Sequence, residues 1–203
     1  MRILVLGLVL AVATPASADD DAPLTYHRHQ FGISARLGVG VRGIATYNSD
    51  YCGTSDSTAK NGNAPVCAGR APLSFDLEAS YGVGSNVELL LDLQIGIERD
   101  FGEAPGDAGP RQLNFAPGVR IFFSDSGHTR LFVQPEAVFD FADYTNTAGM
   151  SRGDDFGLRV LEGLWIDLHR TYGVYFYVAQ TAEVARWLEG ESDLGVGFQA
   201  RYP

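Results

Sequence analysis

Acidic residues that stand two positions apart are the first feature of this chain that could carry out chemistry. Asp76 and Glu78 form one such pair, and Glu189 and Glu191 form another. Two neighbouring carboxyl groups can divide the roles of general acid and general base between them. Both pairs, however, lie in segments where polar and apolar residues alternate, and residues two apart on a β-strand project from the same face. We therefore interpret them as parts of a polar strand face rather than as catalytic pairs.

The four histidines do not complete a nucleophilic site. A hydrolase that uses serine, histidine and an acid needs the three groups within hydrogen-bonding distance. His27 and His29 fall in a polar leader, where contact with a metal ion or lipid headgroups is the alternative to simple solvation. His128 and His169 fall in predicted turns, and none of the four lies on a strand beside a candidate serine. We expect no catalytic site, no metal site, no cofactor and no enzyme activity.

A period of two in hydrophobicity dominates the rest of the chain. From Leu73 to Tyr81 the odd positions are apolar and the even positions are polar, and a similar alternation runs from Val87 to Phe101. This period predicts β-strands with two chemically different faces. Segments of about ten alternating residues separated by turns are typical of a transmembrane β-barrel. Eight such segments are present, at residues 31–47, 73–83, 87–101, 112–123, 130–141, 155–168, 172–185 and 188–202.

The N-terminus has the pattern of an export signal. Met1-Arg2 supplies a short positive start, Ile3–Val12 is an apolar run, and Ala16-Ser17-Ala18 fits a cleavage site. The apolar run is too short to cross a bilayer as a helix. We expect cleavage of the signal at 1–18, a mobile periplasmic leader at 19–30 and one barrel domain at 31–203. The formal net charge of −10 argues against nucleic acid as a partner.

The two cysteines, Cys52 and Cys67, lie in a long polar loop predicted at 48–71. In an oxidising compartment two isolated cysteines are expected to pair. A zinc site would need further ligands, which are not nearby. We predict a disulfide that closes this loop and stabilises the fold by about 3 kcal/mol.

The first six connections between the strands alternate in length. Long polar loops are predicted at 48–71, 102–111 and 142–154, and short turns at 84–86, 124–129 and 169–171. Bacterial outer-membrane barrels place short turns in the periplasm and long loops outside the cell. An even number of strands then places both termini on the periplasmic side.

Alternation alone does not say which strand face is outside. A soluble lipocalin-like barrel turns its apolar face inward around a ligand, whereas a membrane barrel turns it toward lipid. The apolar bulk of all the strands exceeds what a lipocalin cavity could hold as open space. Glycines on the polar face would leave room in a narrow lumen for large charged side chains: Gly32, Gly38, Gly40, Gly96, Gly118, Gly195 and Gly197. Aromatic residues gather near strand ends, as in interfacial girdles: Tyr47, Tyr81, Phe101, Phe123, Tyr172, Trp187 and Tyr202. These features favour the membrane barrel, with Phe75, Leu77, Leu91, Leu93 and Ile95 toward lipid.

The last strand carries a more specific feature. The segment Asp193–Tyr202, with Gly195, Phe198 and Tyr202, is similar to the C-terminal signal through which the outer-membrane assembly machinery recognises its clients. With the strand pattern, it makes the chain from about Phe31 onward resemble the small eight-stranded outer-membrane barrels, such as the membrane domain of OmpA. The chain departs from that family at Pro203, which follows the terminal aromatic residue. The resemblance implies an all-β, closed, antiparallel, up-and-down transmembrane barrel that contacts outer-membrane lipid and the assembly machinery.

Strand parity predicts which charged residues fill the lumen. The arginines are Arg36, Arg42, Arg120, Arg159 and Arg201, and the acids are Asp76, Glu78, Glu88, Asp92, Glu98, Glu136, Asp140, Asp167, Glu183, Glu189, Glu191 and Asp193. An eight-stranded barrel is just wide enough to be filled by side chains, so one interpretation is a salt-bridge network that plugs it. The alternative is a narrow path that prefers cations, because unpaired carboxylates attract them.

The short turn at 84–86 predicts the register of its hairpin and sets Glu78 opposite Asp92. Two like charges opposed in this way need a compensating cation. A following loop centred near Asp107 would place Arg120 beside Asp92 or Gln94. We therefore predict that Arg120 bridges Glu78 and Asp92.

Three residues fit a regular lipid-facing wall poorly. Pro117 and Pro135 fall inside strands, where we expect local bulges. Glu162 falls among apolar residues on the lipid face, with no evident partner.

Taken together, the sequence favours a small integral outer-membrane protein of structural or surface-interaction type with a charge-plugged lumen. A narrow cation-preferring, porin-like channel is the second interpretation, and a soluble periplasmic lipocalin-like barrel is the third. The loop sequences identify no surface partner.

Overall fold

A computed structural model describes residues 27–45, 66–71, 73–97, 113–124, 127–141, 144–145, 151–152, 155–184 and 188–202. These residues are almost entirely β. The strands are β1 Phe31–Ala45, β2 Val66–Arg70, β3 Ser74–Gly82, β4 Val87–Gly96, β5 Leu113–Phe122, β6 Thr129–Asp140, β7 Tyr144–Thr145, β8 Ser151–Arg152, β9 Asp155–His169, β10 Tyr172–Glu183 and β11 Leu188–Tyr202.

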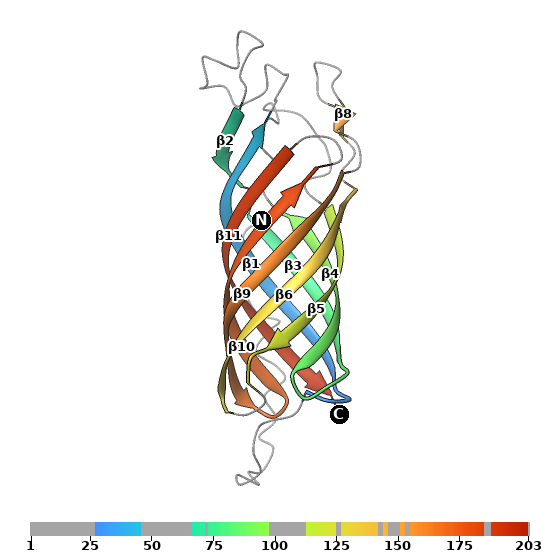
Figure 1. Ribbon diagram of the computed structural model, residues 1–203, viewed down its shortest axis with the longest axis vertical. Helices are drawn as coiled ribbons and strands as arrows, with labels where there is room; N and C mark the ends of the chain where they lie inside the picture. Colours follow the sequence, from blue (N-terminus) through green and yellow to red (C-terminus); the bar gives the residue numbers. More distant parts are fainter. Residues whose placement is uncertain are drawn as a thin grey trace, which may run out of the picture.

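The fold is a closed antiparallel barrel (Figure 1). Neighbouring strands follow the order β1-β3-β4-β5-β6-β9-β10-β11, and β11 pairs back with β1 from Phe31↔Tyr202 to Ala45↔Leu188. This closure pairs both edges of the sheet, so eight strands form the barrel and the predicted fold class is confirmed. Closure matters in lipid, because no water is available there to hydrogen-bond an open sheet edge.

The structure corrects two predicted loops. Residues 66–70 form β2, which pairs with the last part of β1 from Val41↔Arg70 to Ala45↔Val66. The short strands β7 and β8 pair with each other inside the loop predicted at 142–154. Both regions are rich in glycine and polar residues, which conceals short strands from an analysis of periodicity. The eight main strands begin and end within a few residues of their predicted bounds, except the third, which ends at Gly96 rather than 101.

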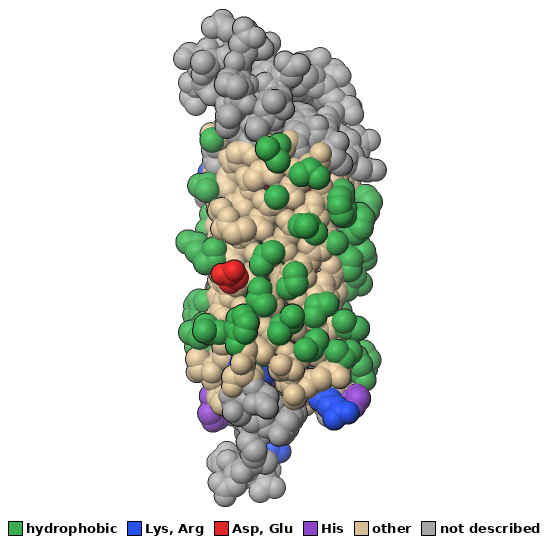
Figure 2. All heavy atoms as spheres, in the orientation of Figure 1, with side chains coloured by type: hydrophobic (Ala, Val, Ile, Leu, Met, Phe, Trp, Pro, Cys, Tyr) green, Lys and Arg blue, Asp and Glu red, His purple; other side chains and the backbone are tan. Residues whose placement is uncertain are grey.

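The two faces of each strand are oriented as a membrane barrel requires. In β4, Leu89, Leu91 and Leu93 are exposed on the outer surface, with Leu89 49% exposed, whereas Asp92 is fully buried inside. Figure 2 shows apolar side chains spread over the barrel wall, with an acidic side chain standing among them. This orientation rules out the lipocalin-like barrel, which would bury these leucines around a cavity. No helix within the described part of the chain is long and apolar enough to span a membrane.

The two ends of the barrel differ, and we name them by their connections. At the turn end, short connections join β3 to β4, β5 to β6 and β9 to β10. The first residue of β1, Phe31, and the last residue of β11, Tyr202, also lie there, and the loop end is the opposite one. Aromatic side chains are exposed around the turn end, including Phe31, Phe123, Tyr172 and Tyr202. They form one of the two girdles expected from the sequence. Tyr47, Phe101 and Trp187 lie outside the described residues.

The bulges expected at Pro117 and Pro135 do not form, because no register shift occurs at either residue. The β5–β6 ladder is nevertheless interrupted there: it keeps one register from Asn114↔Asp140 to Phe122↔Phe132 but includes neither proline among its pairs. The β4–β5 register is constant through Leu91↔Pro117, and the β6–β9 register is constant through Pro135↔Val160. A proline removes one N–H donor, but the paired residues on both sides hold the strands in place.

Candidate functional site

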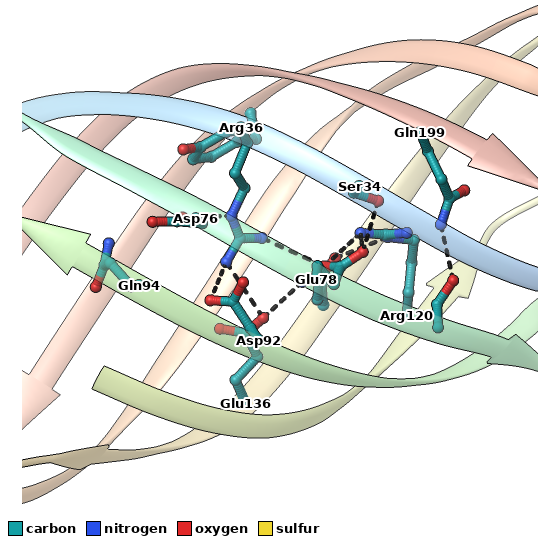
Figure 3. Close-up of polar contacts among 12 residues, drawn as sticks. Ser34, Arg36, Asp76, Glu78, Asp92, Gln94, Arg120, Glu136 and Gln199 are labelled. Carbon is teal, nitrogen blue, oxygen red and sulfur yellow. Dashed lines mark hydrogen bonds and ion pairs between the residues drawn. The ribbon is translucent and has the colours of Figure 1, made fainter. Parts of the chain in front are cut away.

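A closed ring of hydrogen-bonded side chains fills the middle of the lumen, and Figure 3 shows the part of it around Arg36, Glu78 and Asp92. It runs from Glu78 through Arg36, Asp92, Arg159, Glu136 and Gln134 back to Glu78. We call this ring, with Asp76 and Arg120 attached to it, the central network. Its members come from β1, β3, β4, β5, β6 and β9, so it ties most of the barrel wall together.

Arg36 links the β1 side of the central network to two neighbouring strands. Its Nε donates to Asp76 at 2.5 Å, and its Nη2 donates to Asp92 at 2.6 Å. A longer contact of 3.5 Å joins its Nη1 to Glu78. The planar guanidinium suits this role, because it presents several donors in a fixed fork.

Arg159 closes the ring from the opposite side. It donates to both Asp92 and Glu136, and its Nη1 donates to Gln94 at 2.9 Å. Gln134 completes the circuit with bonds of 2.6 Å to Glu136 and 2.8 Å to Glu78. Each carboxylate of the ring therefore meets at least one arginine, as buried charges require.

Arg120 clamps Glu78, as predicted, but it does not reach Asp92. Its Nη2 lies 2.7 and 2.8 Å from the two carboxylate oxygens of Glu78, and its Nη1 lies 2.9 Å from Glu88. The predicted β3–β4 register is confirmed, with Glu78 opposite Asp92. The β4–β5 register was predicted wrongly, because Arg120 pairs with Glu88 rather than with Asp92 or Gln94. Asp92 is compensated instead by Arg36 and Arg159.

Beside the central network, tyrosines of β10 pack against glycines of β11 and fill lumen space that the network does not occupy. A Cβ atom added at Gly195 would lie 2.2 Å from the ring of Tyr177, and one at Gly197 would lie 2.2 Å from the ring of Tyr175. These distances are below any tolerated contact, so the two tyrosines of β10 pack directly against the β11 backbone at these glycines. The predicted role of the glycines, to make room in the lumen, is confirmed at these positions, but the side chains they accommodate are aromatic.

Aromatic rings surround the arginines on the turn-end side of the network. The guanidinium carbon of Arg120 lies 5.1 Å from the ring centre of Trp165, 5.2 Å from that of Tyr175 and 5.4 Å from that of Phe132. Trp165 and Tyr175 stack with their planes 8° apart. Such contacts stabilise a cation that has lost its water, by about 0.5–2 kcal/mol each.

His27 closes the turn end of the lumen. It is 1% exposed, and its ring contacts Glu88 and lies edge-on against Phe122. Arg130 donates to Asp167 at 2.7 Å beside it. The expectation of a mobile, solvated leader is therefore wrong for residues 27–30, which fold against the barrel.

The backbone explains how the leader turns inward. Gln30 N donates to His27 O at 3.1 Å, and His29 has a positive φ of 60° at this tight turn. His29 N donates to Gly82 O at 2.7 Å. A Cβ at Gly82 would lie 1.8 Å from His27 O, so only glycine permits this approach.

The loop end of the lumen is acidic. Arg42 contacts Glu189 at 2.8 Å and Glu191 at 2.7 Å. Asp140 and Asp193 are buried in this half of the barrel, outside the ring.

The buried charges are unevenly distributed along the barrel. Among the described residues, twelve buried acids accompany six buried arginines. The middle holds Asp76, Glu78, Asp92 and Glu136 with three arginines, and the turn end holds Glu88 and Asp167 with Arg130 and Arg201. The remaining six acids (12 − 4 − 2) lie toward the loop end with Arg42: Asp140, Asp155, Glu183, Glu189, Glu191 and Asp193. The excess of negative charge is thus confined almost entirely to one mouth.

Most predicted lumen residues are buried inside, but they do not form one cluster. Arg36, Asp76, Glu78, Asp92, Arg120, Glu136 and Arg159 belong to the central network, whereas Arg201 bonds Asp167 at the turn end at 3.0 Å. Glu98 lies outside the described residues. Five further buried lumen residues were not predicted, although each shares strand parity with an acid or arginine predicted inside: Arg130, Gln134, Trp165, Tyr175 and Tyr177.

Other predicted sites are placed only in part. Phe198 and Tyr202 face outward and Gly195 faces the lumen, which leaves their role as an assembly signal a prediction. Cys52 lies outside the described residues, so the disulfide with Cys67 also stays a prediction. The part of the chain that the structure describes contains no group of three or more histidine, cysteine or acidic side chains arranged to hold a metal ion.

Solved structures with the same architecture set the fold in context. The N-terminal barrel domain of OprF from Pseudomonas aeruginosa aligns with a TM-score of 0.54 and 14% identity over 85% of this chain and 98% of that one. Neisserial surface protein A aligns with a TM-score of 0.59 and 10% identity over 85% of this chain and 97% of that one. This chain has the fold of the small eight-stranded outer-membrane barrels.

A third barrel agrees with these two. Ail, the attachment invasion locus protein of Yersinia pestis, aligns with a TM-score of 0.51 and 15% identity over 85% of this chain and 99% of that one. No family model matches the sequence, and no curated protein matches it significantly. The shared property is therefore the barrel itself.

Proposed function

We propose that this protein is an integral outer-membrane barrel that does not conduct ions and serves as a rigid support for its long loops, in a structural or surface-interaction role. The observation that carries the proposal is the closed ring of the central network across the lumen. A protein built for transport would be expected to keep a path through this section.

The distribution of charge argues against the cation-preferring pore. The acidic loop-end mouth would attract cations, but an ion that enters there next meets Arg36, Arg120 and Arg159 in the middle of the lumen. Each of these arginines has two or more polar partners, so an open path requires several buried ion pairs to break together. Separating a buried pair leaves uncompensated charge, at a cost of about 3–5 kcal/mol.

Location and sidedness complete the proposal. The export signal expected at 1–18 and the apolar outer wall support insertion into the outer membrane from the periplasm. The turn end, where the described chain begins at His27 and the last strand ends at Tyr202, would then face the periplasm. The loop end, where β1 ends at Ala45 and β4 ends at Gly96, would face outward, where loops carry recognition.

Single-channel recording in planar lipid bilayers tests the proposal. We expect no current steps above background from purified, folded protein, with insertion verified by flotation of the same preparation with lipid vesicles. A variant in which Arg36 and Arg159 are both replaced by alanine, which removes two links of the ring, is the matched comparison and should show current if the ring is the barrier. Regular cation-selective steps from the unaltered protein would refute the proposal in favour of the pore.

A further inference from the structure

Glu162 is an acidic residue on the surface that faces lipid. It is the one described aspartate or glutamate with an exposed side chain, because the other described acids are buried in the lumen. Its neighbours across the strands are Val133 on β6 and Val178 on β10. A carboxyl group in this position lacks both water and the lumen arginines, so it demands an explanation.

The depth of Glu162 makes its position costly. It is the middle residue of the 15-residue strand β9, with seven residues on either side (15 − 1, halved). Seven residues of a strand tilted by about 40° span roughly 18 Å along the barrel axis, whereas half of the apolar band is about 12 Å. Three outward apolar residues follow it toward each end of β9: Phe156, Leu158 and Val160, and Leu164, Ile166 and Leu168. Glu162 therefore lies near the middle of the membrane, beyond the reach of headgroups.

The other polar side chains on this part of the wall show what Glu162 lacks. Gln180 on β10 and Ser192 on β11 also face outward, and they are paired strand neighbours. The Ser192 hydroxyl donates to the Gln180 side-chain oxygen at 2.7 Å. Within the described part of the chain, no hydrogen bond or ion pair joins the Glu162 side chain to another residue. One polar pair is thus satisfied within the barrel, and the carboxyl group near mid-membrane is not.

The surface around Glu162 permits a close approach. Val133, Val160 and Val178 border it and are shorter than glutamate, as is Pro135 on the adjoining strand. The carboxyl group therefore projects beyond its surroundings, where a second protein surface could meet it.

We infer that β9 is the contact line of a symmetric dimer of this chain, in which Glu162 of one copy hydrogen-bonds Glu162 of the other. A two-fold axis along the membrane normal always brings a residue to the same depth as its own copy. Two protonated carboxyl groups each donate one hydrogen bond and accept one, so the pair is neutral and satisfied without a further partner. Lipid chains offer no polar group at this depth, so a second copy supplies what the bilayer does not.

Single-molecule photobleaching of the labelled protein in lipid vesicles tests the inference. It measures the fraction of dimers over a range of protein dilutions in lipid. The unaltered protein should dimerise. Glu162→Gln should still dimerise, because two amides can also donate and accept, whereas Glu162→Leu should weaken the dimer by about tenfold or more. Equal dimerisation of Glu162→Leu, or a monomeric unaltered protein, would overturn the inference.

A photocrosslinking residue distinguishes this surface from the opposite one. Placed at Val160 on β9 it should form crosslinked dimers, and placed at Leu77, an exposed residue of β3 across the barrel, it should not. Crosslinking at Leu77 alone, or crosslinking of Val160 to another protein in its native membrane in place of a second copy, would contradict the proposed contact.

The inference rests on the membrane location proposed above, and vesicle flotation tests that location separately. The Glu162→Leu variant should float and fold as the unaltered protein does, so that loss of the dimer is not mistaken for loss of the barrel.

Discussion

Arg120→Ala tests whether the central network stabilises the barrel. Arg120 is completely buried and donates to Glu78, Glu88 and Gln134. Truncation removes the main cation beside Glu78, whose remaining arginine contact, to Arg36, is 3.5 Å long. Removal of one partner from a buried ion pair costs about 3–5 kcal/mol.

Two other contributions change the expected loss in the free energy of unfolding. Loss of the three aromatic contacts adds about 0.5–2 kcal/mol each at most. Against that, Ser34 at 3.1 Å and Gln134 at 2.8 Å still donate to Glu78. We expect the free energy of unfolding to fall by about 4 kcal/mol, since the retained bonds offset part of the loss.

The assay is reversible urea unfolding in lipid vesicles, followed by tryptophan fluorescence. Trp165 is a local reporter, because its ring centre lies 5.1 Å from the Arg120 guanidinium. Arg70→Ala removes the same side chain from an exposed position on β2 and should change stability by no more than about 1 kcal/mol. Glu78→Gln in the Arg120→Ala background should recover part of the loss, because it removes the stranded charge. Unfolding of Arg120→Ala at the same urea concentration as the parent would refute the network as a source of stability.

Four other outcomes are expected. Leu91→Arg should lower the free energy of unfolding in vesicles by about 2–4 kcal/mol, because it places a cation in lipid, and an unchanged value would place Leu91 elsewhere. His27→Ala should cost about 1–3 kcal/mol by leaving polar groups at the turn end without a partner, and wild-type urea stability would mean that the leader is not docked. Gly197→Val should prevent native migration on unheated gels, since its Cβ meets a tyrosine ring at 2.2 Å, whereas a folded band would contradict that packing. Thiol labelling of the denatured, unreduced protein should find neither Cys52 nor Cys67 free, and two labelled thiols would disprove the disulfide.

Strand positions were predictable because each strand has one face toward lipid and the other toward the charged lumen. The alternation of Leu89, Leu91 and Leu93 with Glu88 and Asp92 predicts both the strand and its faces, and the structure confirms both. The β3–β4 register followed as well, because a short turn leaves little freedom in pairing. The structure keeps Glu78 opposite Asp92.

Register across a long loop was not predictable. A long connection does not fix which residues of its two strands are opposed. The assumed loop centre placed Arg120 beside Asp92 or Gln94, four or six residues away from Glu88, with which it pairs. The prediction that Arg120 binds a lumen carboxylate still held, because the lumen contains several acids and offers Arg120 a carboxylate in either register. Arg120 also reaches Glu78, because only β4 separates β5 from β3 in the barrel wall.

The aromatic part of the lumen was missed for a different reason. We equated apolar with lipid-facing, although Trp165 has the same parity as Asp167, and its indole donates to that acid at 2.8 Å. Parity outweighs polarity in a strand, because the backbone fixes the direction of each side chain. His27 had no such signal, since it lies before the first strand and is held by a turn and by contacts with residues distant in sequence.

A membrane barrel is defined by the strand face that meets lipid. The decisive measurement is the accessibility of a nitroxide spin label at Leu91 to oxygen and to a water-soluble nickel chelate. It uses a cysteine at that position in a background where Cys52 and Cys67 are serine, reconstituted in vesicles. If Leu91 faces lipid, the label should be relaxed strongly by oxygen, which concentrates in the bilayer interior, and hardly at all by the nickel chelate. Ready access of the chelate with little effect of oxygen would place this face in water and contradict the membrane barrel.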